Sequence, residues 1–235
     1  TLAFEDLWPS QGDYDMNDVV VGYSTTFTVD KDNRIVAIRD VVTPLHSGGK
    51  LRSAFGYQLD IPVTAVKGVK IENGSSTAGL EKNQDKAVVI LFDDIEQAVA
   101  RGPVSVEIEL DGSLSMDKVT RKSLYNPFIC VSDKGFVPGA VRKEIHLTNY
   151  PPTSLADPYP FGRNDDKSSL DKAGNPIGPY YYATSELYPF AIDLPVTDYR
   201  IPDEMVKIDV FYPDFAGWVK SRGEKHKEWY KNSVK

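Results

Sequence analysis

Apolar and polar residues alternate along several short stretches of this chain, and this alternation limits the folds that the chain can adopt. Residues 51–61 carry Phe55, Tyr57 and Leu59 at alternate positions, and residues 104–110 repeat the pattern with valine, isoleucine and leucine. Successive side chains of a β-strand point to opposite faces, so a period of two predicts strands with one buried face. We therefore expect a fold built from half-buried strands.

The alternating pattern extends over most of the sequence, and helical patterns are few. Asp94 is a candidate N-cap for a short helix that ends before Gly102, and residues 215–230 favour two short helical pieces. A hairpin turn is expected at residues 30–33, because Asp and Asn tolerate turn geometry. Further strands are predicted at 18–29, 34–44, 64–72, 86–92, 125–132, 140–147, 190–194 and 206–211.

These elements predict an all-β fold, an antiparallel β-sandwich of the jelly-roll-like kind with one or two short helices. The 235 residues are 41% hydrophobic and 26% charged, and they contain no obvious linker. We expect one domain over residues 1–235. The proline-rich and tyrosine-rich region 148–189 has almost no periodicity, and its aromatic residues argue against disorder. It is predicted to be a long ordered loop excursion that packs over the sandwich.

Charge and cysteine content exclude several classes of protein. The net charge is −7 and the sequence pI is near 5.0, which argues against a nucleic-acid partner. The single cysteine, Cys130, precludes an intrachain disulfide and lies in an apolar run. No apolar stretch approaches the roughly 20 residues of a membrane span. Because the sequence opens at Thr1 without a leader, we expect a mature or trimmed chain.

An acidic cluster stands directly before the first long strand. Asp13, Asp15 and Asn17 follow the D-x-D-x-N spacing that opens many calcium loops, in which successive oxygens turn onto one point. The sixth and twelfth loop positions are Asp18 and Ser24 rather than Gly and Glu, so the loop is not an EF-hand. Further ligands for the ion are expected among backbone carbonyls and Glu5, Asp6, Asp18, Asp165 and Asp166.

The alternative interpretation of this cluster is a hydrogen-bonded turn, in which the acidic and amide side chains bond their own backbone. Carboxylates that lie close together raise one another's pKa unless a cation neutralises them. We therefore favour calcium as the cofactor, with a structural role.

Several ordered stretches also resemble a known family. They are FEDLWPSQGDYDMNDVVVGY (4–23), EIHLTNYPPTSLADPYPFGRNDDKS (144–168), PFAIDLP (189–195), YPDFAGWV (212–219) and EWY (228–230). Together they resemble the LruC-type domain of bacterial surface and secreted proteins, many of them from Bacteroidota. The likeness covers nearly the whole chain.

The resemblance implies a secreted, surface-attached or periplasmic location and no established catalytic activity. It also implies calcium ligands at Asp13, Asp15, Asn17 and Asp18, with Glu5 and Asp6 nearby and Asp165 and Asp166 as ligands from a second motif.

Catalytic motifs are missing from the sequence. The three histidines, His46, His146 and His226, lack metal-ligand spacing, and there is no G-x-S-x-G elbow and no phosphate loop. Paired carboxylates keep glycoside hydrolysis open as a less favoured alternative. We predict a non-enzymatic adhesive or scaffolding module.

Aromatic residues of the excursion suggest the second hypothesis, a carbohydrate-binding module. Aromatic faces stack well on the apolar faces of sugar rings. The alternative is that the same side chains anchor the excursion to the sandwich, and we favour that alternative. A glycan or a cell-surface protein is the expected partner. The candidate ligand-binding residues are Tyr159, Phe161, Tyr180, Tyr181, Tyr182 and Tyr188.

Overall fold

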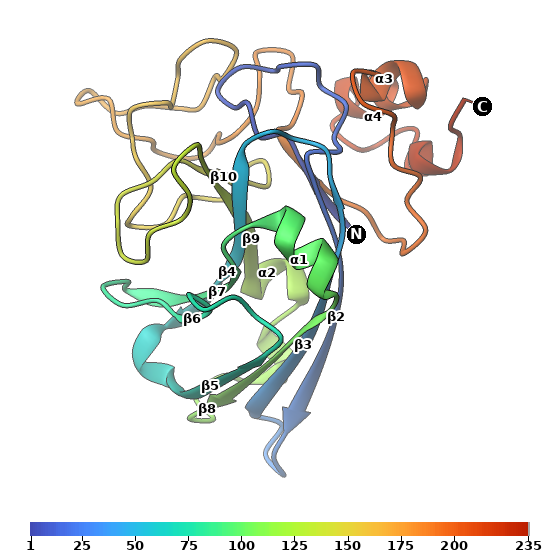
Figure 1. Ribbon diagram of the computed structural model, residues 1–235. Helices are drawn as coiled ribbons and strands as arrows, with labels where there is room; N and C mark the ends of the chain where they lie inside the picture. The colour runs from blue at the N-terminus through green and yellow to red at the C-terminus, as the bar shows by residue number, and fades with distance from the viewer. Residues whose placement is uncertain (235) are drawn as a thin grey trace.

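Two antiparallel β-sheets stack face to face in the computed structural model, which describes residues 1–234 (Figure 1). The six-stranded sheet has the order β11-β1-β2-β3-β8-β5, and the five-stranded sheet has the order β10-β9-β4-β7-β6. The strands are β1 (Leu2–Phe4), β2 (Val19–Val29), β3 (Ile35–Ser47), β4 (Arg52–Pro62), β5 (Val66–Glu72), β6 (Gly79–Leu80), β7 (Lys86–Phe92), β8 (Val104–Leu110), β9 (Tyr125–Ser132), β10 (Glu144–His146) and β11 (Ala191–Asp193). The predicted all-β sandwich is confirmed.

The main core lies between the two sheets and follows the alternation of the sequence. Along β8 the apolar residues Val104, Val106 and Ile108 are buried, and the residues between them face outward. Phe55 of β4 stacks on Phe92 of β7 with a 5.6 Å separation of the ring centroids. Burying such side chains stabilises a fold by about 1.5–3 kcal/mol each, so this core holds the two sheets together.

Helices are short and occupy the connections and the C-terminal part. They are α1 (Ile95–Arg101), α2 (Arg121–Leu124), α3 (Ile208–Phe211) and α4 (Phe215–Lys220), with 3-10 turns η1 (Val63–Ala65), η2 (Met116–Lys118) and η3 (Trp229–Lys231). Asp94 caps α1 by accepting from the Gln97 amide, and Gly102 ends it at φ +90°, as the sequence predicted. The turn at residues 30–33 and the two helical pieces within 215–230 are confirmed as well.

The strand predicted at 206–211 is wrong, because residues 208–211 form helix α3. Ile208, Phe211 and Tyr212 are buried at the spacing of one helix face, and a run of six residues cannot distinguish that spacing from alternation. The predicted strand 140–147 shrinks to β10, and the short strands β1 and β6 were not predicted.

A second hydrophobic core lies on the outer face of β1, β2 and β11. Helices α3 and α4 lie beside one end of the sandwich, near the N-terminus (Figure 1), and their buried residues pack there on Ala3, Val20 and Ile192. Val20 points into this core while Val19 and Val21 point into the main core. All three consecutive valines are buried because the start of β2 has an apolar layer on both faces.

The excursion 148–189 contains no helix and only isolated β-bridges. Trp8, Phe161 and Tyr182 pin it to the sandwich, with ring centroids 4.9 Å apart for Trp8 and Phe161 and 5.1 Å for Trp8 and Tyr182. All three side chains are buried. The prediction of an ordered excursion that packs over the sandwich is confirmed.

Candidate metal site

The acidic loop, residues 5–18, connects β1 to β2. Tyr14 and Met16 have φ values of 58° and 57°, a left-handed conformation that is unfavourable for such residues. Their side chains are buried in the second core, and this packing holds the unusual backbone in place. Alternate left-handed residues bend the loop back on itself, which folds Asp13 and Asp15 toward the C-terminal segment.

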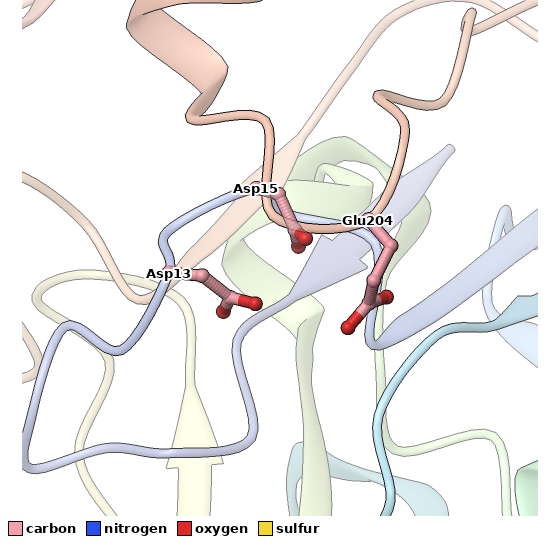
Figure 2. Close-up of side chains that lie close together, drawn as sticks. All are labelled: Asp13, Asp15 and Glu204. Carbon is pink, nitrogen blue, oxygen red and sulfur yellow. The ribbon is translucent and has the colours of Figure 1, made fainter.

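Asp13 and Asp15 form an outer group together with Glu204. One carboxylate oxygen of each residue lies within 4.8 Å of the others. Figure 2 shows the three side chains converging from the acidic loop and from the segment that precedes α3. The Met205 amide donates to Asp15 Oδ2 at 2.9 Å, and this bond fixes the two segments against each other. No sequence signal identified Glu204, because it lies 189 residues after Asp15 and outside any metal-ligand spacing.

Asp6 and Asp18 form a separate inner group. The Asp6 amide donates to Asp18 Oδ2 at 2.8 Å. Their other oxygens face Gly49: a Cβ on that residue would lie 2.2 Å from Asp6 Oδ2 and 2.8 Å from Asp18 Oδ1. Only glycine permits so close an approach. The turn between β3 and β4 is therefore shaped around these two carboxyl groups.

Burial and mutual repulsion raise the pKa values of four carboxyl groups in the loop, those of Glu5, Asp6, Asp15 and Asp18. Burial first, and the neighbouring Asp6 carboxylate second, raise the pKa of Asp18 to about 8. Burial is also the main reason that the pKa of Asp15 rises to about 6 and that the pKa of Glu5 lies well above its usual value. The Lys143 ammonium group approaches this region, but it donates to the backbone oxygens of Asp6 and Trp8. The Lys143 charge lowers the pKa of Asp6, but burial outweighs it and the pKa of Asp6 is still raised.

Three buried oxygen atoms of the loop have no hydrogen-bond partner within residues 1–234: Glu5 Oε2, Asp6 Oδ2 and Asn17 Oδ1. The other oxygen of Glu5 accepts from the Met16 amide at 2.6 Å, and the Asn17 amide group donates to the Pro202 carbonyl at 3.2 Å. Buried polar atoms normally find a partner, and leaving one unpaired costs about 1–3 kcal/mol. A bound cation would satisfy such oxygens.

The two acids of the second motif make different contacts. Asp166 accepts from Trp8 Nε1 at 3.0 Å, from the Gly162 and Ser168 amides, and from Ser168 Oγ. Asp165 is exposed and accepts from the Gln11 amide at 2.9 Å. Both residues tie the excursion to the acidic loop, and neither belongs to the outer or the inner group. Their role as metal ligands stays a prediction.

The candidate ligand-binding aromatic residues are not brought together. Phe161 and Tyr182 are in the main core, whereas Tyr159 and Tyr180 are 66% and 47% exposed. Tyr181 is half-buried against the main core. Tyr188 is half-buried and lines a polar cleft of about 590 Å³ between the acidic loop, the excursion and the start of α3.

Comparison with known proteins places this architecture in a family. The sequence matches a family described as a domain of unknown function (DUF4842) over residues 33–230. The chain belongs to the DUF4842 family. No curated protein matches it. Among solved structures, this chain is similar to one from Bacteroides ovatus that is provisionally described as a lipoprotein, with a TM-score of 0.68 and 19% identity.

That likeness covers 99% of this chain and 73% of the Bacteroides ovatus chain. At 19% identity it shows the shared fold alone. The LruC-type name rests on the resemblance of the sequence stretches, and the comparisons support a DUF4842 domain of unknown function. Among residues 1–234 no helix has the length and apolarity that a bilayer span requires.

Proposed function

We propose that this DUF4842 domain, a member of the LruC-type group, is a non-enzymatic module of the bacterial surface or envelope that binds Ca²⁺ for structural reasons. The surface location is supported by the resemblance to surface and secreted proteins and by the similar fold of the Bacteroides ovatus chain. In this proposal the domain holds an adhesive or scaffolding surface in a fixed shape.

The convergence of Asp13, Asp15 and Glu204 carries the calcium proposal. Ca²⁺ takes 6–8 oxygen ligands at about 2.3–2.6 Å, so three carboxylates within 4.8 Å of one another are within reach of one ion. The outer group contains only oxygen donors, which suit a hard cation. The ion would join the acidic loop to the segment that precedes α3, and it would offset the repulsion among the carboxylates.

Thermal unfolding with and without metal tests this proposal. Chelator-treated protein should melt at a higher temperature when Ca²⁺ is added. A ligand at a hundredfold excess over its dissociation constant contributes about 2.7 kcal/mol, which corresponds to a rise of roughly 5–10 °C for a domain of this size. Mg²⁺ should act weakly, because it requires a tighter octahedral site.

Glu204 and its neighbour Asp203 provide a matched pair of variants. Both are exposed, but only Glu204 belongs to the outer group. The Glu204→Gln variant should lose most of the calcium response, and the Asp203→Asn variant should keep it. An equal response in the two variants would place the ion elsewhere, and no response in the natural chain, with no metal found in the untreated protein, would refute the proposal.

The second candidate function is glycan binding, and the polar cleft beside Tyr188 favours it. The cleft brings this aromatic side chain together with Asn164, Lys167 and Glu186. Such a set offers a stacking face beside hydrogen-bonding groups. A glycan array on the calcium-loaded protein separates the two functions, because a scaffold binds no sugar and a carbohydrate-binding module loses its signal in the Tyr188→Ala variant.

A further inference from the structure

The inner group differs from the outer group in its residues and in its surroundings. Asp6 and Asp18 are 3% and 6% exposed, whereas Glu204 of the outer group is exposed. The inner group lies under the Gly48–Gly49 turn, and the outer group faces the segment that precedes α3. One ion at the outer group therefore leaves the inner carboxyl groups without a bound metal ion.

We propose that a second hard divalent cation, Ca²⁺ by preference, binds at the inner group between the carboxylates of Asp6 and Asp18, with Asn17 Oδ1 as a third ligand. The site goes beyond the outer calcium site and does not depend on it.

Unpaired oxygen atoms supply the first argument for this inner site. Asp6 Oδ2 and Asn17 Oδ1 are buried and accept no hydrogen bond from any of the described residues. Hydrogen bonds fix the rest of both residues: the Asp6 amide donates to Asp18, and the Asn17 side-chain NH₂ donates to the Pro202 carbonyl. Asp6 and Asn17 are only 3% and 1% exposed, so burial separates the two unpaired oxygens from bulk water.

The glycine turn supplies the second argument. A Cβ on Gly48 would lie 2.0 Å from Asn17 Oδ1, and a Cβ on Gly49 would lie 2.2 Å from Asp6 Oδ2 and 2.8 Å from Asp18 Oδ1. Contacts below 3.0 Å do not occur for real Cβ atoms. Three side-chain oxygens thus crowd against one two-residue turn, and the two carboxylate oxygens near Gly49 are within reach of a single ion.

Charge supplies the third argument. Two carboxylates and an amide oxygen form an all-oxygen donor set, which selects a hard divalent ion and leaves the site neutral once the ion is bound. The Lys143 ammonium group donates to the backbone oxygens of Asp6 and Trp8. Its single charge lowers the pKa of Asp6 but offsets only one of the two carboxylates. The competing arrangement is a single proton shared between the two carboxyl groups.

Metal stoichiometry decides between the cation and the shared proton. Bound metal is removed from the full chain with a chelator, and the protein is then equilibrated with Ca²⁺. The number of calcium ions per chain is measured by elemental (inductively coupled plasma) mass spectrometry. Circular dichroism confirms the fold of each variant. We expect two ions in the natural chain, one in the Glu204→Gln variant and one in the Asp18→Asn variant, in which the new amide oxygen can still accept from the Asp6 amide.

The counts in the natural chain and in Glu204→Gln detect a second ion without any change in the inner group. The count in a folded Asp18→Asn variant then assigns that ion to the inner group. One ion that is lost in Glu204→Gln overturns the inner site and leaves the outer site standing. One ion that is retained in Glu204→Gln but lost in Asp18→Asn supports the inner site and refutes the outer one. Two ions in Asp18→Asn, or none in the natural chain, overturn the inner site.

Discussion

Asp165 and Asp166 are adjacent acids that differ in burial and in the number of hydrogen bonds they accept. Asp166 is fully buried and accepts four hydrogen bonds, one of them from the indole of Trp8. Asp165 is exposed and accepts one bond, from the Gln11 amide. Hydrogen bonds to a charged acceptor are the stronger ones, so Asp166 is expected to be a main support of the excursion.

Replacing each acid by alanine tests this difference. Asp166→Ala leaves the buried donors of Trp8 and Ser168, and the partly buried Gly162 amide, without an acceptor. Each buried donor left unpaired costs about 1–3 kcal/mol. We expect the free energy of unfolding to fall by roughly 3 kcal/mol or more. Asp165→Ala serves as the control and should cost about 1 kcal/mol or less. Urea unfolding of the two variants measures both values, and equal losses would contradict this assignment.

The residue scale also shows what sequence could and could not reveal about the site. The D-x-D-x-N spacing placed Asp13 and Asp15 correctly beside each other, because the ligands of a local loop are close in sequence. Glu204 carried no such signal, since tertiary folding alone brings it to the loop. The inner pair shows the same limit: Gly49 matters only because β3 and β4 carry it to Asp6 and Asp18.

At the scale of the elements, a buried carboxyl group links the two sheets. Asp40 of β3 accepts hydrogen bonds from Thr25 of β2, Tyr57 of β4 and Tyr125 of β9. Burial raises the pKa of Asp40, while the three hydroxyl donors and the Arg121 charge partly counteract it. The group is thus a polar connection in an otherwise apolar core.

The raised pKa fixes the sign of a pH effect. Because folding raises the pKa of Asp40 above its ordinary value of 3.8, the folded state binds its proton more tightly than the unfolded state does. Its contribution to stability is complete below that ordinary value and is lost as the pH rises through the raised pKa. The slope is at most about 1.4 kcal/mol per pH unit.

The Asp40→Asn variant should therefore lose this part of the pH dependence. Relative to the variant, the natural chain should be most stable near the acidic end of the range and should lose that advantage toward neutral pH. Urea unfolding at several pH values in constant Ca²⁺ measures the difference. Asp32→Asn, which changes an exposed acid of the 30–33 turn, should run parallel to the natural chain, and a parallel curve for Asp40→Asn would contradict the prediction.

The elements themselves were largely predictable because local patterns determine them. Strands β3 and β8 follow their alternation, and α1 follows its Asp94 cap and Gly102. The prediction that 51–61 is half-buried is wrong, because residues 53–59 of β4 are buried on both faces and Ala54 packs in a further small core. Strand β1 has only three residues and is buried on both faces, so it lacks a period. Helix α3 was mistaken for a strand because its buried face packs in the second core. No local sequence pattern indicates that core.

At the scale of the whole molecule, the C-terminal segment and the N-terminal loop support each other. The helical segment packs on Ala3, Val20 and Ile192 of strands β1, β2 and β11. Within it, the Trp229 ring contacts Tyr212 and Phe215. Glu204 and Met205 precede this segment and meet Asp15 of the acidic loop. An ion at the outer group would thus join the two ends of the described chain, although they are distant in sequence.

Hydrogen exchange measured by mass spectrometry should reveal this coupling. Removal of Ca²⁺ should increase exchange in residues 5–18 and 199–231, because the ion no longer holds the segment against the loop. The central strands β3, β4 and β8 should change little, since the main core between the sheets holds them independently of the ion. In Glu204→Gln the faster exchange should persist in the presence of Ca²⁺, and Asp203→Asn should behave as the natural chain does. Local release of one segment leaves hydrogen exchange unchanged in sheets that a different core stabilises. A uniform increase in exchange across both sheets would therefore mean that the ion stabilises the whole sandwich.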